Sequence, residues 1–406
     1  EESFPEEAAV TAEAMKEAAA TAEAPEEAAV TTEAPEEDSS ASAPLLNAEQ
    51  HRAVCSLAPH LAVKAGPGTG KTKTLVSRIQ YLLQNRGIKP GEITAVTFTN
   101  QAAAEMRERI SQALGQKQLG RELQIGTFHG ICLNFLREQG EQFTLLGEGQ
   151  ARKLAEEALL EQGLSENGRK FLEAVSLINS GAEEGRIQEI FRDVTGTDFP
   201  EKARAALEAY REKKEQRGLW DFDDLLLKTI EKIQEGQAKE GWERRFRYLL
   251  VDEFQDINPV QRQLIRLWCS YGGELFAIGD ADQSIYGFRG ADADCFEKLK
   301  EEYPDLEMIQ LKENYRSTPQ IVDTAQTVIA HNPGPKRLLR ANRPGGVPVR
   351  VVQAKSSLGE AIFVAKEINR LAGGIGMLEA HREAWERHGR KIRSFGDIAV
   401  LYRTHR

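Results

Sequence analysis

Residues 65–72 read Ala-Gly-Pro-Gly-Thr-Gly-Lys-Thr and directly follow an apolar run, residues 60–65, that is typical of a buried strand. Leucine and isoleucine in residues 75–83 then recur at helical spacing. A glycine-rich turn between a strand and a helix is the arrangement of a phosphate-binding loop, because its backbone N–H groups turn inward around phosphate oxygens. The segment therefore predicts a nucleoside triphosphate site in an α/β fold.

The polar residues of this loop have separate predicted roles. Lys71 is expected to reach the β- and γ-phosphates, and the Thr72 hydroxyl is expected to bind Mg²⁺. The strict pattern begins with Gly where this chain has Ala65, a mild departure because that position is only the entry to the loop. A chance glycine-rich turn is the alternative, which the flanking strand and helix disfavour. The backbone that would surround the phosphates belongs to Gly66, Gly68, Thr69 and Gly70.

A second apolar strand, residues 248–251, ends in the two carboxylates Asp252 and Glu253. Asp252 at the strand tip can bind Mg²⁺ opposite Thr72, and Glu253 can orient and deprotonate a water for attack on a γ-phosphate. Two acids after a strand can also simply cap the next helix. Their pairing with a phosphate loop favours the catalytic interpretation.

Apolar runs and helical stretches alternate along most of the chain, which indicates a parallel α/β sheet. Residues 141–218 differ, because they are charged, helical in pattern and poor in β-branched runs, and we interpret them as a helical insertion. A new α/β unit is expected after Thr318, with a helix to His331 and a helix at 361–371. The predicted strands are residues 60–65, 93–98, 123–126, 248–252, 275–279, 306–311, 347–352 and 398–402.

The first 44 residues have a different composition. They hold 12 Glu and one Asp against Lys16 alone, and a decamer such as Pro-Glu-Glu-Ala-Ala-Val-Thr-Ala-Glu-Ala repeats within them. Such a segment buries too little apolar surface to fold, so we predict a disordered acidic linker, which is compatible with an upstream domain. The remaining residues carry a net charge of −10 + 12 = +2, which leaves a nucleic-acid partner open.

Four widely spaced cysteines and the absence of an 18-residue apolar run do not indicate a disulfide framework, a zinc site or a membrane span. No basic-then-apolar segment opens the chain. These features predict a reduced, cytoplasmic protein.

Nine segments in this order resemble those of the superfamily 1 DNA helicases of the UvrD/Rep/PcrA type. Any one of them is weak evidence, and their common order carries the resemblance. They are LNAEQ at 46–50, AGPGTGKT at 65–72, VTFTNQAAAEMRERI at 96–110, GTFHGIC at 126–132, LWDFDDLL at 219–226, VDEFQD at 251–256, GDADQSIYGFRGAD at 279–292, ENYRST at 313–318 and AVLYRT at 399–404.

The resemblance implies a RecA-like, parallel-sheet P-loop NTPase domain with an inserted helical subdomain and the incomplete start of a second RecA-like domain. It divides the chain into a linker at 1–44, a first motor domain at 45–140 and 219–317, the helical insertion at 141–218, and the start of the second domain at 318–406.

By the same resemblance, the parent protein would be an ATP-driven motor that uses Mg²⁺, moves along single-stranded DNA from 3′ to 5′ and separates strands at duplex junctions. Gln50 would read the adenine edge and Tyr315 would stack on the base. Lys73 stands beside that ring where relatives often have Arg, and an ammonium lacks the planar face of a guanidinium. Gln283 and Arg316 resemble residues that sense the γ-phosphate.

DNA contacts are predicted where aromatic residues follow strands. Bases stack on such rings with little sequence preference, although loop aromatics also fold back onto a sheet. Gln283 lies three residues before Tyr286, a predicted base contact. This spacing suggests that the segment couples ATP hydrolysis to movement along DNA. The predicted DNA-facing rings are Phe98, Tyr286 and Phe288, and Thr127, His129 and Arg289 are predicted to contact phosphates or to order these loops.

The family's second motor domain continues past the AVLYRT segment and supplies an arginine to the ATP site. Because this chain ends at Arg406, we expect it to bind ATP but to hydrolyse it poorly by itself. Two alternatives remain open at this point. The chain is a non-enzymatic ATP-dependent DNA-binding or interaction module, or it is the helicase part of a helicase-nuclease.

Overall fold

The computed structural model describes the chain from Leu46 onward, with gaps. The acidic repeat lies outside the described residues, so its predicted disorder stays a prediction. Two compact units follow one another along the chain, the first ending at Gly346 and the second beginning at Val347. The structure describes residues 46–115, 122–164, 167–181, 187, 191–192, 200–285, 294–332, 338–372 and 394–402.

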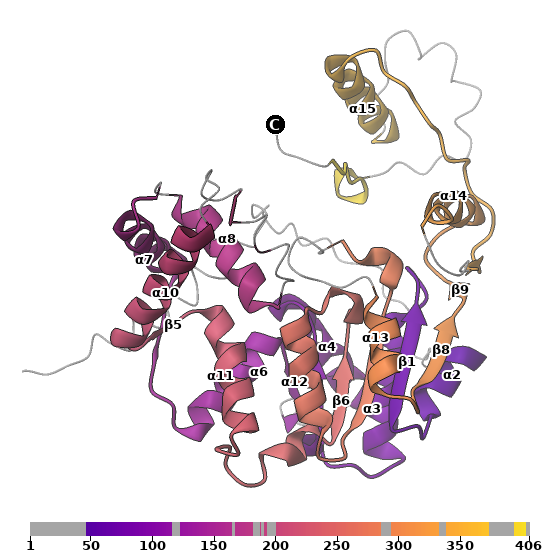
Figure 1. Cartoon of the computed structure of the whole chain (residues 1–406). Helices are drawn as coiled ribbons and strands as arrows, with labels where there is room; N and C mark the ends of the chain where they lie inside the picture. The colour runs from indigo at the N-terminus through magenta and orange to yellow at the C-terminus, as the bar shows by residue number, and fades with distance from the viewer. Residues whose placement is uncertain are drawn as a thin grey trace, which may run out of the picture. The chain divides into compact units, whose positions relative to one another are not determined.

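A parallel sheet forms the centre of the first unit, with the strand order β3-β2-β6-β7-β1-β8 (Figure 1). The structure therefore confirms the α/β class and the six strands predicted before residue 312. The largest boundary difference is at β2, which ends at Val96 and leaves Thr97 and Phe98 in the following loop, and four other strands differ from their predicted ranges by one residue. The strands are β1 (His60–Ala65), β2 (Ile93–Val96), β3 (Gln124–Gly126), β6 (Tyr248–Val251), β7 (Glu274–Gly279) and β8 (Glu307–Leu311).

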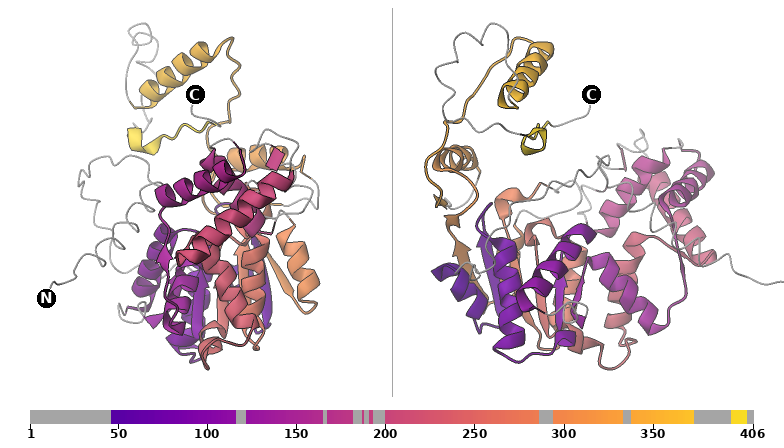
Figure 2. Two further views of the ribbon diagram at one scale, coloured as in Figure 1. Left: turned by 60° about the vertical axis from the view of Figure 1, so that its left-hand side comes forward. Right: turned by 180° about the vertical axis from the view of Figure 1, so that it is seen from behind.

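Helices cover both faces of this sheet (Figure 2). Strand β1 shows why, because Leu61 and Val63 point to one layer of helices and Ala62, between them, points to the other. Both faces are thus apolar, as is usual in parallel sheets. One layer holds α2 (Ala48–Cys55), α3 (Lys71–Gln84) and α4 (Asn100–Leu114), and the other holds α6 (Phe128–Gln139), α11 (Phe222–Gln234), α12 (Pro259–Cys269) and α13 (Cys295–Glu302).

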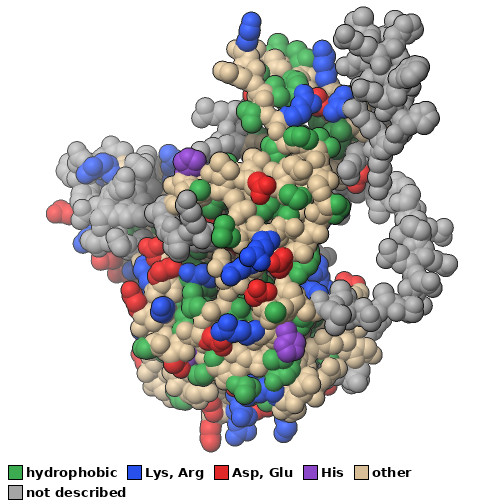
Figure 3. Space-filling view, turned by 90° about the vertical axis from the view of Figure 1, so that its right-hand side faces the viewer, with side chains coloured by type: hydrophobic (Ala, Val, Ile, Leu, Met, Phe, Trp, Pro, Cys, Tyr) green, Lys and Arg blue, Asp and Glu red, His purple; other side chains and the backbone are tan. Residues whose placement is uncertain are grey.

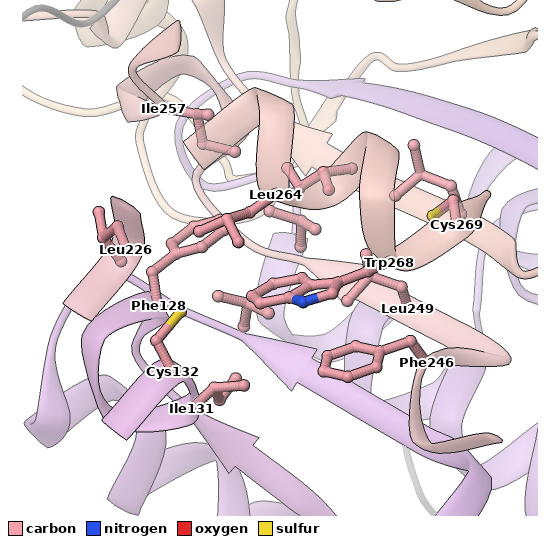
Figure 4. Close-up of a cluster of buried hydrophobic side chains, with 14 of the residues drawn as sticks. Phe128, Ile131, Cys132, Leu226, Phe246, Leu249, Ile257, Leu264, Trp268 and Cys269 are labelled. Carbon is pink, nitrogen blue, oxygen red and sulfur yellow. The ribbon is translucent and has the colours of Figure 1, made fainter. Parts of the chain in front are cut away.

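The larger of the two cores is built around Trp268 on α12 (Figure 4). Its ring is 1% exposed and stacks on Phe246 with ring centroids 4.6 Å apart and on Phe128 at 5.8 Å. Asn258 caps α12 through a hydrogen bond from the Gln261 backbone, and Pro259 opens the first turn. This packing holds α12 against β6 and β7, the two strands that lead into the predicted catalytic loops.

The stretch predicted as a helical insertion contains helices that pack around a core of their own, and its status as a separate subdomain stays a prediction. A short parallel ladder joins its beginning to its end, where Leu145 pairs with Trp220. The Trp220 ring stacks on Phe143 at 4.1 Å. The elements are β4 (Thr144–Leu145), α7 (Glu148–Glu161), α8 (Gly168–Asn179), α10 (Pro200–Gln216) and β5 (Leu219–Trp220).

Beyond β8 the first unit continues through a short parallel pair. Strand β9 (Glu313–Asn314) pairs with β10 (Arg340–Ala341), and α14 (Pro319–Ile329) lies between them in sequence. Three short 3₁₀ helices complete the loops around the sheet: η2 (Trp242–Phe246), η3 (Phe254–Asp256) and η4 (Ala281–Gln283). A further one, η1 (Pro90–Glu92), precedes β2.

The second unit contains α15 (Ser357–Leu371), which confirms the helix predicted there, and η6 (Phe395–Asp397). The strands predicted at 347–352 and 398–402 are wrong, because both segments are irregular in the structure. A strand needs a neighbour to satisfy its backbone N–H and C=O groups, and among the described residues neither run has such a partner. The valines of the first run remain exposed, with Val351 at 96%.

The face of the molecule that bears α2 and β8 carries acidic and basic side chains side by side (Figure 3). Arg52 on α2 pairs with Glu307 on β8 at 2.6 Å, and Ser56 donates to the other oxygen of the same carboxylate at 2.6 Å. Of the helices that the structure describes, none is both long and apolar enough to cross a membrane.

A partly buried carboxylate joins the helical insertion to the sheet domain. Asp223, in the first turn of α11, accepts hydrogen bonds from Ser176 Oγ at 3.2 Å and from Asn179 Nδ2 at 3.3 Å, both on α8. Burial, and after it the neighbouring carboxylate of Asp221, raises the pKa of Asp223 to about 6.

We predict that Asp223→Asn stabilises the protein more at neutral pH than at acidic pH. Because the pKa of Asp223 is raised above its ordinary value of 3.8, the folded protein binds this proton more tightly than the unfolded chain does. The wild type therefore loses stability as the pH rises from about 4 to about 6, and Asn avoids that loss. Urea unfolding of both proteins across this range measures the difference. A stability gap that does not widen with pH contradicts the prediction.

Candidate active site

The carboxyl ends of the parallel strands bring the predicted catalytic segments to one edge of the sheet. Strand β7 lies between β1 and β6, so the loop after β1 and the acids after β6 are separated by one strand. Residues 280–284, which follow β7, lie between them. This edge is where ligands bind in open α/β sheets.

Two glycines give the loop at 65–72 its turn. Gly68 and Gly70 have φ of 69° and 84°, a left-handed conformation that residues with a Cβ rarely adopt. Thr69 is fully buried and its hydroxyl donates to Gly66 O at 2.7 Å, which closes the loop on itself. Lys71 is the first residue of α3, so its side chain and the helix N-terminus face the same space.

The segment after β8 fixes the loop from outside. Asn314 is 2% exposed, and its Nδ2 donates to Pro67 O at 2.7 Å while its Oδ1 accepts from the backbone N–H groups of Arg316 and Ser317. Tyr315 N donates to Gly68 O at 2.9 Å. A Cβ on Gly68 would lie 2.6 Å from Arg316 Cβ, so only glycine permits this approach.

The central contact of the site joins the phosphate loop to the acidic pair. Lys71 Nζ lies 2.8 Å from Glu253 Oε2, and the lysine side chain is only 13% exposed. Gln255 Nε2 donates to the same oxygen at 2.9 Å. The predicted phosphate-binding lysine and the predicted base are therefore in direct contact, and their catalytic roles stay predictions.

Glu253 reaches this position through an unusual backbone. Its φ is 46° and its ψ is 48°, and it is the one residue other than glycine with positive φ among those that the structure describes. A left-handed residue with a Cβ costs about 1–2 kcal/mol, so the surrounding contacts must hold it there. Such strain concentrates at functional sites, which agrees with the predicted role of this carboxylate.

Asp252 and Thr72 are the predicted Mg²⁺ ligands, and this shared role stays a prediction. Burial, and after it the Glu253 carboxylate, raises the pKa of Asp252 to about 6. Asp256, four residues after Asp252, has a buried Oδ1 without a hydrogen-bond partner in the described structure. Poorly solvated carboxylates are stabilised by a nearby cation. The described residues form no cluster of three or more His, Cys, Asp or Glu that could hold a metal ion.

Two residues of the predicted base-binding side, Gln50 and Tyr315, both contact Asn47, the N-cap residue of α2. Gln50 is 1% exposed, its Nε2 donates to Thr69 O at 2.9 Å, and its Oε1 accepts from Asn47 N at 3.1 Å. Asn47 Nδ2 in turn donates to the Tyr315 hydroxyl at 2.9 Å. Tyr315 is 47% exposed, so its ring is open to a base. Lys73 follows on α3, and burial lowers its pKa.

Of the two predicted γ-phosphate sensors, Gln283 is held by a hydrogen bond and Arg316 has an exposed side chain. Gln283 Nε2 donates to Asp280 Oδ2 at 3.0 Å, and both residues line a cavity of about 220 Å³ together with Gly66 and Pro67. Arg316 is exposed, and the described part of the chain provides no ion-pair partner for its guanidinium. Its role stays a prediction.

Phe98 and Thr127, two predicted DNA contacts, lie at the ends of the neighbouring strands β2 and β3. Thr97 N donates to Gly126 O at 3.0 Å, which joins the two loops. Phe98 is half-buried, and Thr127 caps α6 by accepting from Gly130 N at 3.2 Å. Tyr286, Phe288 and Arg289 lie outside the described residues, so their predicted contacts remain predictions.

Phosphate binding and loop ordering are both predicted for His129, and both roles stay predictions. Its ring meets Phe222 edge-on, with centroids 5.9 Å apart. Burial lowers the pKa of His129 to about 4, so the imidazole is neutral at physiological pH and offers no positive charge to a phosphate.

Sequence reasoning missed Asn314 and Gln255, although both lie inside segments that it had singled out. Each is a buried amide, at 2% exposure, whose hydrogen bonds connect two separate loops. From the sequence alone, a buried amide that joins two loops cannot be distinguished from an amide that is exposed to solvent. Only the surrounding backbone donors and acceptors reveal its role.

Comparison with known proteins agrees with this geometry. Residues 46–304 match the UvrD/REP helicase N-terminal domain, and residues 309–406 match the UvrD-like helicase C-terminal domain. The chain is 35% identical over 380 residues to the ATP-dependent DNA helicase UvrD1 of Mycobacterium tuberculosis, 34% over 368 residues to DNA helicase II of Escherichia coli, and 31% over 372 residues to the ATP-dependent DNA helicase PcrA of Staphylococcus epidermidis.

Each of these alignments covers 89% of this chain and 47% or 48% of the relative. The chain thus spans about half the length of the curated relatives that it matches. The N-terminal domain match alone covers more than half of the chain, and it contains the phosphate loop, the acidic pair and Gln283. The chain belongs to the UvrD/REP helicase family.

Proposed function

We propose that this chain is the nucleotide-binding part of an ATP-dependent DNA helicase that moves along single-stranded DNA from 3′ to 5′ and opens duplex junctions. The single observation that carries the proposal is the 2.8 Å contact between Lys71 Nζ and Glu253 Oε2. It supports a shared cleft for phosphate binding and water activation. The names of the relatives support DNA as the second ligand.

In the proposed cycle, the phosphates of ATP draw Lys71 away from Glu253. The ammonium then neutralises β- and γ-phosphate charge, and the backbone N–H groups around Gly68 and Gly70 donate to phosphate oxygens. Thr72 and Asp252 would hold Mg²⁺, which supplies further positive charge to the phosphates. Tyr315 would stack on the adenine, since its ring is exposed beside the loop.

The release of Lys71 leaves Glu253 without its cation and therefore a stronger base. The carboxylate takes a proton from the attacking water as the water oxygen forms a bond to the γ-phosphorus and the bond to the ADP oxygen breaks. Arg316 and Gln283 would stabilise the charge on the transferred phosphoryl group. We still expect this chain to hydrolyse ATP poorly by itself. The test is to compare its ATP turnover with that of a longer version that contains the same residues.

We predict that Lys71→Ala weakens ATP binding about 10- to 100-fold, because a charge-assisted contact to phosphate is lost. Titration with a fluorescent ATP analogue in the presence of Mg²⁺ measures the affinity. Lys228→Ala is a matched control, since Lys228 pairs with Glu231 on the surface of α11. Equal loss in both variants would refute a specific role for Lys71.

Glu253→Gln is expected to separate binding from hydrolysis. The amide cannot accept the proton of the attacking water, so the rate should fall by roughly 10²- to 10⁴-fold. ATP should bind at least as tightly as to the wild type, because the carboxylate no longer competes for Lys71 and no longer repels the phosphates. The same titration, with single-turnover hydrolysis on DNA, gives both quantities. Weaker ATP binding by this variant is the outcome that contradicts the proposed competition.

Phe98→Ala tests the DNA-facing edge. Stacking on one base contributes about 1–3 kcal/mol, so affinity for a single-stranded oligonucleotide should fall about fivefold or more. Tyr271→Ala is the control, because Tyr271 is a 62% exposed aromatic residue located just before β7, at the opposite end of the strands. Fluorescence anisotropy measures both affinities. An unchanged affinity of the Phe98 variant would place the DNA elsewhere.

A further inference from the structure

Gln255 lies where the loop after β6 meets the loop after β7. No catalytic or binding role was assigned to it above. Its side chain is 2% exposed. Nε2 donates to Glu253 Oε2 at 2.9 Å and to Asp256 Oδ2 at 3.3 Å, and Oε1 accepts from Asp280 N at 2.8 Å. The amide therefore uses both donor hydrogens toward carboxylates and its acceptor toward a backbone N–H group. The opposite orientation would place oxygen against oxygen, so the contacts define it.

The end of β7 is shaped to admit this amide. A Cβ on Gly279 would lie 2.4 Å from Gln255 Oε1 and 2.8 Å from Phe254 N, so only glycine allows so close an approach. Ser284 adds a second contact between the same two loops, because its Oγ donates to Gln255 O at 3.2 Å. The loop after β6 and the loop after β7 thus meet through Gln255.

Two side chains donate to Glu253 Oε2 among the described residues, Lys71 and Gln255. In the proposed cycle Lys71 moves to the phosphates of ATP. Gln255 is then the donor that remains, and it alone of the two fixes where the carboxylate points. A carboxylate at a strained backbone position depends strongly on such a contact.

The amide oxygen of Gln255 is connected through Asp280 to Gln283, the predicted γ-phosphate sensor. Asp280 donates its N–H to Gln255, and its Oδ2 accepts from Gln283 Nε2 at 3.0 Å. Gln283 N also donates to Asp280 O at 2.9 Å. A continuous chain of hydrogen bonds therefore runs from Lys71 through Glu253, Gln255 and Asp280 to Gln283.

We propose that Gln255 is a positioning residue that holds Glu253 for water activation after Lys71 has left it and that couples this change to the segment 280–284. The proposal rests on the proposed function, because it needs ATP to separate Lys71 from Glu253. The segment 280–284 would then respond to two states of the site, one with the ion pair between Lys71 and Glu253 formed and one with it broken.

If Gln255 has only a structural role, its removal should have a different effect. A buried amide that only fills space and satisfies its neighbours would lower stability when removed, and the folded protein would keep its response to nucleotide. A positioning role changes turnover and the nucleotide response at temperatures where the protein is fully folded. These two outcomes can be measured separately.

The test uses Gln255→Met, which keeps the length of the side chain and removes every hydrogen bond that the side chain makes. Gln261→Met is the matched control, since Gln261 is 7% exposed and its side chain bonds only within the capping box of α12. Hydrogen–deuterium exchange of residues 275–285 and 65–72 is recorded with and without the Mg²⁺ complex of a non-hydrolysable ATP analogue. Thermal unfolding confirms that each variant is folded at the temperature used.

In the wild type and in Gln261→Met, the analogue is expected to change exchange in both segments. In Gln255→Met the phosphate loop should still respond, and residues 275–285 should not. Affinity for the analogue should stay within about threefold, whereas turnover of ATP should fall roughly 10- to 100-fold. A Gln255→Glu variant keeps the acceptor for Asp280 N–H and places a carboxylate against Glu253, so it should lose turnover as well.

Equal nucleotide responses of residues 275–285 in the wild type and in Gln255→Met would overturn the inference and leave the proposed function intact. A wild-type phosphate loop that does not respond to the analogue would overturn the proposed function itself, and the inference with it. Should Gln255→Met fail to fold, turnover of Gln255→Glu provides the test, because this variant loses the donor to Glu253 and keeps the acceptor for Asp280 N–H. Unchanged turnover of Gln255→Glu would then overturn the inference.

Discussion

The ion pair between Lys71 and Glu253 is the contact on which the arrangement of the site depends. Without nucleotide, an ammonium at a helix N-terminus is close to backbone N–H groups that carry partial positive charge, and two carboxylates lie on the facing loop. Pairing these opposite charges stabilises both loops and offsets the left-handed backbone of Glu253. The same contact occupies the two groups that are proposed to bind phosphate and to activate water. In the proposed cycle nucleotide binding breaks this contact, which would link occupancy of the site to water activation.

Buried amides hold the loops around Lys71 and Glu253 in place. Asn314 fixes the phosphate loop to the segment after β8, Gln50 fixes it to α2, and Gln255 connects the two loops that follow β6 and β7. An amide can donate and accept at once, so it can join a carbonyl on one loop to an N–H group on another. A movement at the phosphates can reach several elements because each of these contacts spans two of them.

Much of the fold could be predicted from the sequence, because local patterns and burial agreed. Six apolar runs became the strands of the central sheet, and the charged stretch at 141–218 became a helical bundle. The runs at 347–352 and 398–402 have equal strand character and formed no strand. Strand propensity describes how well a segment fits beside a neighbour, and a ladder exists only where that neighbour is present.

The sequence by itself determined the phosphate loop, the acidic pair and the family to which the chain belongs, because glycines, a lysine and carboxylates at fixed spacing encode their chemistry locally. Only the tertiary structure decided that Lys71 and Glu253 are in contact, that His129 is neutral, and that Gln255 bridges two loops. The charge of a histidine depends on its burial, and the partner of an amide depends on which backbone groups lie within 3 Å of it. Both are set by segments distant in sequence, so no local pattern contains them.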